Sequence, residues 1–483
     1  MLLSKLKETL VQGWNSPTLM TWGSFFSRSL SLVVVLPLLL TRLTTAEISL
    51  WYILMTVIGL QTLVDIGFSP TFIRVISYAM GGAAVQDLKS PRRENTGQPN
   101  WDTIATIYGS MRRIYLFLGI LWTSLLAIGG TLALLKPVSA VEDRGSAWIA
   151  WGVVLAVSNI TVRSNIYSSY LQGTNRVALL RRWETLTSLG GIATSFLVLI
   201  LGGGLLGLVI AHQGWQTINI LRNIWLARII ENGKQRTFAN VPFNREVFAA
   251  VWPSAWRSGV GVLMSYGLIQ ASGIFYAQIG ATASVASYLL GLRLFQTVSQ
   301  FSQAPFYSKI PLYSRLYAEG RRDELVRLAQ RGMRFSHWTY VAGFVGLGLF
   351  GAPLLKIIGS NVTFPDSLLW SLLGLAFFVE RYGAMHIQLY STTNHIIWHI
   401  ANGVTGTIYI IVSILLFNYF GVYAFPLGIL AGYLGFYAWY SASHAYRAFN
   451  LGFFSFEKSA SILPLVVVLL YVALNETLIK ALW

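Results

Sequence analysis

Charged side chains stand inside long apolar stretches of this sequence, where they are rarely found. The arginines in these stretches are Arg28, Arg74, Arg163, Arg222, Arg257, Arg293 and Arg381, and the carboxylates are Asp65 and Glu380, with Glu184 near the end of another stretch. A charge at the centre of a transmembrane helix costs about 2.5–3.5 kcal/mol on insertion scales, so it usually faces an aqueous cavity or a partner. The positive excess predicts a cavity that attracts an anion.

Polar residues recur at helical spacing in two related segments. Gln61, Asp65 and Ser69 are four residues apart, which would place them on one face of a single helix. A second polar stripe consists of Arg293, Gln296, Gln300 and Gln303. An offset of 235 residues pairs Gln61 with Gln296, Pro70 with Pro305, Arg74 with Lys309, Tyr78 with Tyr313 and Asp65 with Gln300. We interpret these matches as an internal repeat, from which many transporters are built.

A structural role is the alternative for each charged residue. Arginines near the ends of a span can extend to the membrane surface, which applies to Arg74, Arg222 and Arg257, whereas Arg28 and Arg293 stand near the middle. Asp65 can hold an arginine, either Arg28 or Arg74, instead of carrying a proton, and we favour the ion pair. Glu380 and Arg381 are adjacent, about 100° apart on a helix, and can instead satisfy neighbouring helices.

The predicted site combines these residues. The substrate-binding set is Arg28, Arg74, Arg163, Arg257, Arg293, Arg381, Gln61, Gln296 and Gln300, and the charge-pairing or coupling residues are Asp65 and Glu380. The histidines do not have metal-ligand spacing, so we expect no metal. The sequence contains neither a phosphate-binding loop nor a large loop that could hold an active site, so we expect no cofactor and no enzyme activity.

Composition predicts a polytopic all-α membrane protein. Hydrophobic residues make up 54% of the 483 residues and charged residues 11%, which excludes an ordinary soluble domain. The net charge of +17 does not indicate nucleic-acid binding, because the basic residues lie in short loops between apolar spans. The absence of cysteine excludes disulfides and thiolate sites.

Hydropathy predicts thirteen spans, in two six-helix lobes and one further helix. They lie at about 19–41, 48–79, 113–135, 147–170, 184–201, 205–226, 248–276, 283–309, 335–356, 367–392, 396–418, 422–446 and 460–480. The predicted lobes are residues 1–246 and 247–447, followed by the helix in 448–483. Residues 320–334 are expected to form a separate amphipathic helix on the cytoplasmic leaflet.

Loop charges predict a cytoplasmic N-terminus. With that orientation 23 of the 35 Lys and Arg residues lie on the inside, among them Arg112 and Arg113, and 5 on the outside. A second, weaker repeat signal supports two lobes, because the Leu-Gln-Gly-Thr-Asn segment ending at Asn175 has a counterpart in Tyr-Ser-Thr-Thr-Asn ending at Asn394.

Several motifs resemble the Wzx-type polysaccharide flippases of the MOP superfamily, which also contains the lipid II flippases and the MATE exporters. They are Phe25-Phe-Ser-Arg28-Ser, Asp65-Ile-Gly-Phe, Arg74-Val-Ile-Ser, Leu171-Gln-Gly-Thr-Asn and Ile310-Pro-Leu-Tyr-Ser. The resemblance covers essentially the whole chain. It implies two pseudo-symmetric lobes around a cavity that opens alternately to each membrane face, with cavity arginines that bind pyrophosphate. Arg28, Arg74 and Arg293 stand on the corresponding helices.

The resemblance therefore implies a flippase of the bacterial inner membrane. Its substrate would be an undecaprenyl-pyrophosphate-linked oligosaccharide, moved from the cytoplasmic to the outer leaflet. Membrane lipid and polysaccharide assembly proteins would be its partners, and coupling to H+ or Na+ is left open. The alternative is a MATE-like ion-coupled exporter of small molecules, which should carry more intramembrane carboxylates. A non-transporting membrane scaffold is the third alternative, but a scaffold would have no reason to keep arginines in the bilayer.

Overall fold

The computed structural model describes residues 14–65, 67–89, 97–139, 141–238, 240–261, 282–358 and 363–482, and for some of them only the backbone. Contacts divide the chain into two units, Met1–Ala255 (unit 1) and Trp256–Trp483 (unit 2). The division falls nine residues after the predicted lobe boundary, inside a helix that covers residues 245–261. The second half of the span predicted at 248–276 lies outside the described residues.

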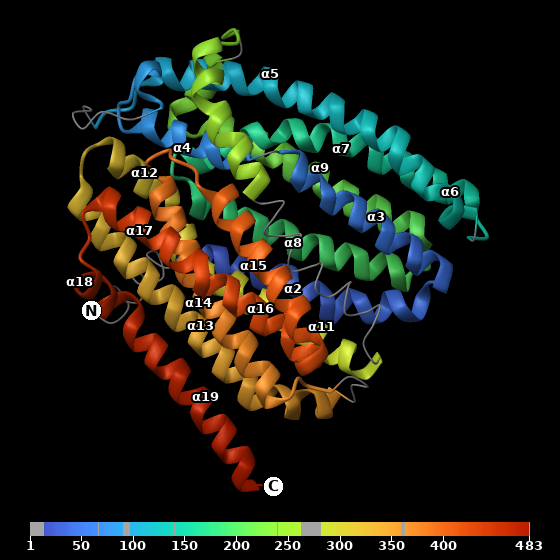
Figure 1. The fold of residues 1–483 in the computed structure, drawn as a ribbon. Helices are drawn as coiled ribbons and strands as arrows, with labels where there is room; N and C mark the ends of the chain where they lie inside the picture. Colours follow the sequence, from blue (N-terminus) through green and yellow to red (C-terminus); the bar gives the residue numbers. More distant parts are fainter. Residues whose placement is uncertain are drawn as a thin grey trace, which may run out of the picture. The chain divides into compact units, whose positions relative to one another are not determined.

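Unit 1 is a bundle of helices in the described part of the chain (Figure 1). Its long helices are α2 (Pro17–Arg42), α3 (Thr45–Val64), α4 (Phe68–Met80), α5 (Trp101–Leu125), α6 (Thr131–Ser139), α7 (Arg144–Gly173), α8 (Val177–Ile200) and α9 (Gly204–Ile229). The short helical turns are η1 (Val85–Asp87), η2 (Leu126–Gly130) and η3 (Glu231–Phe238). The largest helix contacts join α2 to α8 and α7 to α9.

The span predicted at 48–79 is not one helix but two. Helix α3 ends at Val64 and α4 begins at Phe68, after Gly67, whose φ of 72° lies in the left-handed region that glycine enters freely. Asp65 closes the break, because its Oδ2 accepts a hydrogen bond from the Ser69 amide at 2.8 Å. The prediction that Gln61, Asp65 and Ser69 share one face of a continuous helix was therefore wrong. Gly67 breaks the helix there, and Asp65 accepts the Ser69 amide in the first turn of α4.

The related segment in unit 2 is broken at a different place. Helix α11 runs without interruption from Thr282 to Tyr307, and the chain bends at Ser308 and Lys309 before α12 (Ile310–Ala318). The repeat places Gln300 where unit 1 has Asp65, and Ser302 where it has Gly67. Since Ser302 lacks the conformational freedom of glycine, α11 continues through this position.

Unit 2 continues with α13 (Arg322–Ile358), α14 (Ser367–Ser391), α15 (Trp398–Phe420), η4 (Gly421–Tyr423), α16 (Ala424–Gly432), η5 (Tyr433–Tyr437), α17 (Ala438–Phe449), α18 (Phe453–Glu457), η6 (Lys458–Ile462) and α19 (Leu463–Leu482). Its core is aromatic. The ring of Phe295 lies 4.4 Å from that of Trp370 and stacks on that of Phe377, with 5.5 Å between ring centres. Helix α19 packs on α13 and α14, so the C-terminal helix belongs to this unit.

Residues 320–334 do not form a separate helix at the membrane surface. Residues 322–334 instead form the beginning of α13, which is a single helix of 37 residues. The predicted apolar face exists, since Leu325, Ala329 and Met333 are fully buried, but it packs against Phe306 and Tyr313 within unit 2. The sequence between residues 322 and 352 contains no proline to end the helix, so the amphipathic turns and the span stay collinear.

The two Thr-Asn segments that follow α7 and α14 adopt the same conformation. Asn175 has a φ of 61° and Asn394 a φ of 64°, so each leaves its helix through the left-handed region that asparagine tolerates. In each segment a threonine hydroxyl donates a hydrogen bond to the carbonyl of a preceding tyrosine. Thr174 donates to Tyr170, and Thr393 donates to Tyr390. The two segments that match in sequence therefore also share a local turn.

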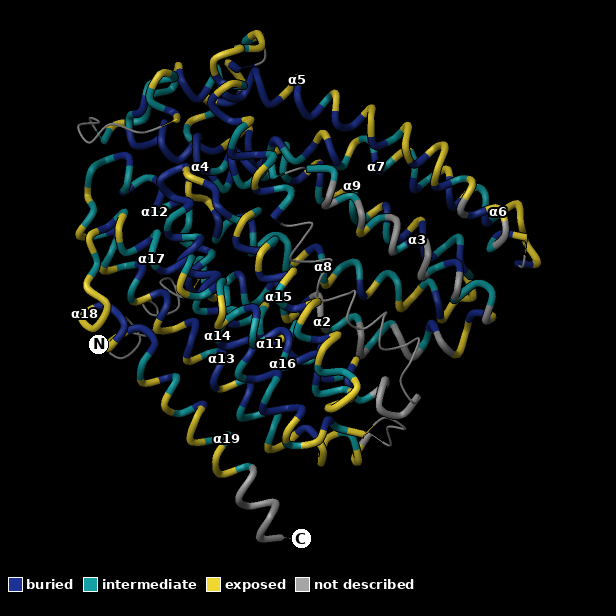
Figure 2. The backbone as a smooth tube through the Cα atoms, viewed as in Figure 1, coloured by how far each residue is buried: buried dark blue, intermediate teal, exposed yellow. Residues whose placement is uncertain are grey.

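The fold is all-α and polytopic, as predicted. Seven helical segments of the described residues are long and apolar enough to cross a membrane, by length and composition. The longest, Trp398–Phe449, includes the sharp turn at Gly421 between α15 and α16. Helix α14 is the most buried of these segments, whereas α5 exposes much of its outer surface (Figure 2).

Candidate functional site: a polar cavity in unit 1

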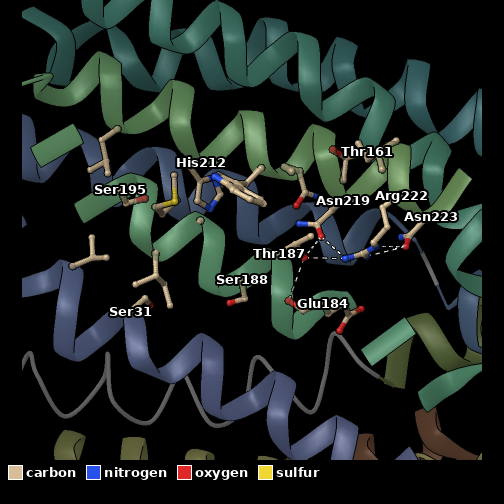
Figure 3. Close-up of a pocket in the computed structure, with 18 of the residues that line it drawn as sticks. Ser31, Thr161, Glu184, Thr187, Ser188, Ser195, His212, Asn219, Arg222 and Asn223 are labelled. Atoms are coloured by element: carbon tan, nitrogen blue, oxygen red, sulfur yellow. Dashed lines mark hydrogen bonds between the residues drawn. The ribbon is translucent and has the colours of Figure 1, made fainter. Parts of the chain in front are cut away.

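A cavity of about 690 Å³ lies among five helices of unit 1. Its polar lining is Ser31 from α2, Thr161, Ser164, Asn165 and Ser168 from α7, Glu184, Thr187, Ser188 and Ser195 from α8, and His212, Gln216, Asn219, Arg222 and Asn223 from α9. Apolar side chains of α2, α3, α8 and α9 complete the wall. Figure 3 shows these side chains converging on one space between the helices.

Helical periodicity explains why these residues meet. The polar residues of α8 and α9 recur every three or four positions, which places them on one face of each helix. The opposite faces are apolar and exposed, as at Leu186, Leu197, Leu221 and Trp225. In a bilayer the exposed apolar face contacts lipid, so the polar face must turn into the bundle.

Arg222 is the charge at one end of the cavity. Its Nη1 donates hydrogen bonds to Thr187 Oγ1 at 2.9 Å and to Asn219 Oδ1 at 2.7 Å. Its Nη2 donates to Asn223 Oδ1 at 2.8 Å, and Thr187 also donates to Asn219 Oδ1 at 2.6 Å. Figure 3 shows this chain of contacts. These hydrogen bonds to Thr187, Asn219 and Asn223 orient the guanidinium beside the cavity.

Glu184 lies near the same end of the cavity, one turn from Thr187 on α8. Its Oε2 accepts hydrogen bonds from Arg181 at 2.8 Å and from Ser24 of α2 at 3.1 Å. The contact with Ser24 joins the two helices that pack most extensively in unit 1. The carboxylate therefore both lines the cavity and holds α2 against α8.

The other end of the cavity is formed by aromatic rings and His212. The His212 ring meets Trp51 edge to face, with 5.9 Å between ring centres. Trp215 donates a hydrogen bond to Thr194 at 3.0 Å and lies directly over Gly190, where any added Cβ would come within 2.2 Å of the indole. Glycine in α8 thus makes room for this indole, in agreement with the close packing typical of small residues in membrane helices.

Two predicted site residues of unit 1 make contacts within the protein. Gln61 of α3 donates a hydrogen bond to the Ser158 carbonyl of α7 at 3.0 Å. Arg74 is buried in α4 and donates to Thr71 at 3.1 Å. Neither residue is part of the cavity lining. Their roles as substrate-binding groups stay predictions.

Among the described residues, Ser69 and Tyr115 are hydrogen-bond partners of the Asp65 carboxylate. Its Oδ1 accepts hydrogen bonds from Ser69 Oγ at 2.7 Å and from Tyr115 Oη at 2.9 Å. Arg74 is not among the described partners of this carboxylate. The side chain of Arg28, the other arginine considered, lies outside the described residues, although its helix α2 forms one wall of the cavity.

Arg163 lies in a second pocket of unit 1, between α5 and α7. Its aliphatic stem packs on Gly119 of α5, where an added Cβ would lie 2.9 Å from Arg163 Cγ. Ser164 and Ile220 line both pockets and so form the wall that separates them. Arg112 and Arg113, which the sequence placed in or next to a loop, belong to the fourth turn of α5, because that helix begins at Trp101.

In unit 2, the predicted stripe lies along α11. Arg293 and Gln300 are exposed and Gln296 is partly buried, as expected for one helix face. Arg257 is also exposed, with its guanidinium 5.7 Å from the ring centre of Trp256. These positions leave all four side chains available to a ligand, and their role stays a prediction.

Glu380 and Arg381 of α14 contact each other. Arg381 Nη2 lies 3.5 Å from Glu380 Oε2 and donates to the Ser299 carbonyl of α11 at 3.2 Å. The Arg381 guanidinium also lies 5.9 Å from the centre of the Tyr307 ring. These contacts tie α14 to α11, the structural role left open in the sequence analysis.

The amides and hydroxyls of the cavity were not among the residues predicted from the sequence. Of the predicted site residues whose side chains are described, none lines it. The usable signal was the run of hydroxyl and amide residues at helical spacing in two apolar stretches, from Thr187 to Ser195 and from His212 to Asn223. Because these side chains are neutral, they give a weaker signal in an apolar stretch than charged residues do.

No protein-family model matches the chain, and no curated protein matches its sequence. Solved structures do. A MATE protein in complex with MaD3S has a TM-score of 0.68 at 14% identity, covering 91% of this chain and 98% of that one. An outward-facing multidrug resistance MATE family transporter of the MOP superfamily has a TM-score of 0.66 at 15% identity, with the same two coverages. The Vibrio cholerae MATE transporter VcmN in its bent form has a TM-score of 0.60 at 17% identity, covering 91% and 99%. The chain therefore has the fold of MATE transporters of the MOP superfamily.

Proposed function

We propose that this chain is a membrane transporter that flips an undecaprenyl-pyrophosphate-linked oligosaccharide between the leaflets of the bacterial inner membrane. A polar head group cannot cross hydrocarbon without a hydrogen-bonding path, whereas its polyprenyl tail can stay in lipid. The observation that carries the proposal is the cavity of unit 1, in which hydroxyls and amides line the wall and Arg222 is oriented by hydrogen bonds to Thr187 and Asn219. Such a surface suits an anionic, hydroxyl-rich head group.

A MATE-like exporter of small molecules is the second candidate. It is favoured by the solved structures of similar fold, whose printed names are those of MATE transporters, and by a carboxylate, Glu184, in the cavity lining. The two candidates differ in the charge that the cavity must attract. A flippase of this kind needs Arg222 to bind an anion, whereas an exporter of cations would depend on Glu184.

Reconstitution distinguishes the two candidates. The purified chain is placed in liposomes that carry a fluorescent undecaprenyl-pyrophosphate sugar, and flipping is measured as loss of protection from a membrane-impermeant quencher. We expect flipping of the lipid-linked sugar and no efflux of the cationic dye ethidium. Ethidium efflux without flipping would support the exporter and overturn the flippase proposal.

Variants test the cavity itself. We expect Arg222→Gln to lower flipping at least tenfold, because a neutral amide cannot replace a charge-assisted bond to phosphate. Arg228→Gln removes the same charge from an exposed position later in α9 and serves as the matched control. The predicted residues Arg28 and Arg293 are tested in the same assay, with lysine replacements expected to rescue only part of the activity. Normal flipping by Arg222→Gln would remove the cavity from the transport path.

A further inference from the structure

The second pocket of unit 1, of about 860 Å³, gathers three arginines. Arg112 and Arg113 come from α5 and Arg163 comes from α7. Apolar side chains form much of the remaining wall, namely Leu116, Ile160, Ile166, Ile220 and Ile224. The pocket therefore combines a cluster of cationic side chains with an apolar surface. This combination is complementary to a phospholipid, whose anionic phosphate adjoins its apolar acyl chains.

The positive charge of this pocket is not neutralised by the side chains around it. Within the described residues, none of the three arginines forms an ion pair, and the lining contains no carboxylate. All three side chains are exposed. Like charges held close together repel one another, so an anion bound among them relieves that repulsion.

The pocket lies where the apolar outer surface of unit 1 ends. Large apolar side chains of α5 are exposed from Phe117 onwards, about one turn after Arg113. On α7 the exposed Ile160 lies about one turn before Arg163. On α9 the exposed Trp225 is the residue after Ile224, which lines the pocket. Exposed apolar residues contact the acyl chains, and tryptophan and arginine are typical of the head-group level. The three arginines thus lie beside the edge of this exposed apolar surface.

A segment that leads out of unit 1 forms one wall of the pocket. Residues 240–243 line it, and they precede the helix at 245–261 in which the chain passes into unit 2. The segment lies on α5 at Gly109, where an added Cβ would come within 2.5 Å of the Val241 carbonyl oxygen. The Asn244 amide donates to Ser110 Oγ at 3.1 Å. These contacts fix the wall beside the arginines, so the pocket is built by the fold.

We propose that this pocket binds the phosphate head group of an anionic phospholipid from the cytoplasmic leaflet. Arg112, Arg113 and Arg163 donate hydrogen bonds to the phosphate oxygens, and the acyl chains follow the apolar wall. The bound lipid contacts residues 240–243 and so stabilises the segment that connects the two units. This proposal is independent of the proposed function, because the pocket is separate from the cavity of Arg222.

The test measures retention of phosphatidylglycerol by the purified full-length chain, using native mass spectrometry with phosphatidylcholine as the competing lipid. We expect the chain to retain phosphatidylglycerol in preference to phosphatidylcholine. The triple variant R112Q/R113Q/R163Q should lower that retention roughly tenfold or more, since each surface arginine contributes to binding an anionic head group. The triple lysine variant keeps the charge and should retain part of the binding.

The matched control is R228Q/R236Q/R245Q, which removes three exposed arginines of the same unit from outside the pocket. We expect it to retain phosphatidylglycerol as the unchanged protein does. Equal retention by the pocket variant and the unchanged protein, or equal loss in both triple variants, would overturn the site. Displacement of the lipid by millimolar inorganic phosphate would overturn its assignment to a lipid head group.

Discussion

The Nε2 atom of His386 lies 2.9 Å from Oε1 of Glu457, and both side chains are fully buried in unit 2. Glu457 also accepts hydrogen bonds from Tyr446 at 2.6 Å and from Ser461. His386 belongs to α14, Tyr446 to α17 and Glu457 to α18, so one carboxylate joins three helices. This contact attaches the C-terminal helical segment to the rest of the unit.

Replacing His386 by alanine should lower the free energy of unfolding by about 3 kcal/mol, because a buried carboxylate loses its partner while two hydroxyls still satisfy part of it. Thermal unfolding in detergent measures the change. The double variant His386→Leu, Glu457→Leu removes both polar groups and should be more stable than His386→Ala. The exposed His395 provides the control, since His395→Ala should unfold as the unchanged protein does. An unchanged melting temperature in His386→Ala would show that the contact contributes nothing.

Asp65 should tolerate asparagine but not alanine. The asparagine oxygen can still accept from the Ser69 amide, and its NH2 group can donate to the Ser69 or Tyr115 hydroxyl that now donates to Asp65. Alanine removes the acceptor of the Ser69 amide in the first turn of α4, which costs about 1 kcal/mol, and leaves the buried Tyr115 hydroxyl with fewer partners. Melting temperatures of the two variants measure this difference. If Asp65→Asn is as unstable as Asp65→Ala, the negative charge itself is required, as the ion-pair hypothesis expects.

Gly190 should not accept a side chain. An alanine Cβ would lie within 2.2 Å of the Trp215 ring, so the indole must leave its place or α8 must move away from α9. Overpacking of this kind costs about 1–3 kcal/mol. Gly214 is the matched control, because a Cβ at this position in α9 meets no atom within 4 Å. We expect Gly190→Ala to melt lower and Gly214→Ala to melt at or above the original temperature; equal melting would show that the indole moves without cost.

The predicted orientation can be tested with single cysteines, since the chain contains none of its own. Cysteines at Glu142 and Thr363, both exposed, should react with a membrane-impermeant thiol reagent in intact cells. Cysteines at Gln98 and Asp323, also exposed, should react only after the membrane is permeabilised. This pattern follows from the excess of Lys and Arg on the cytoplasmic side. The reverse labelling would show that the N-terminus lies outside.

Several features of this protein could be predicted from the sequence alone. Long apolar stretches identify membrane helices, because only a helix satisfies its own backbone in hydrocarbon. The Thr-Asn segments that end at Asn175 and Asn394 match in sequence, and both asparagines have a positive φ, which depends only on local conformation. The break between α3 and α4 could also have been predicted, because Asp65 and Gly67 are residues that often end one helix and begin another.

Side-chain partners were decided by the tertiary structure. Asp65 bonds Tyr115, fifty residues away, and Arg222 bonds Thr187, thirty-five residues away. His386 meets Glu457 across seventy-one positions of the chain. Helical spacing states which face a residue occupies, but the neighbouring helix that packs on this face depends on how the bundle assembles. The cavity of unit 1 exists only where the polar faces of α7, α8 and α9 meet, so its residues could be recognised as a site only once these helices were placed side by side.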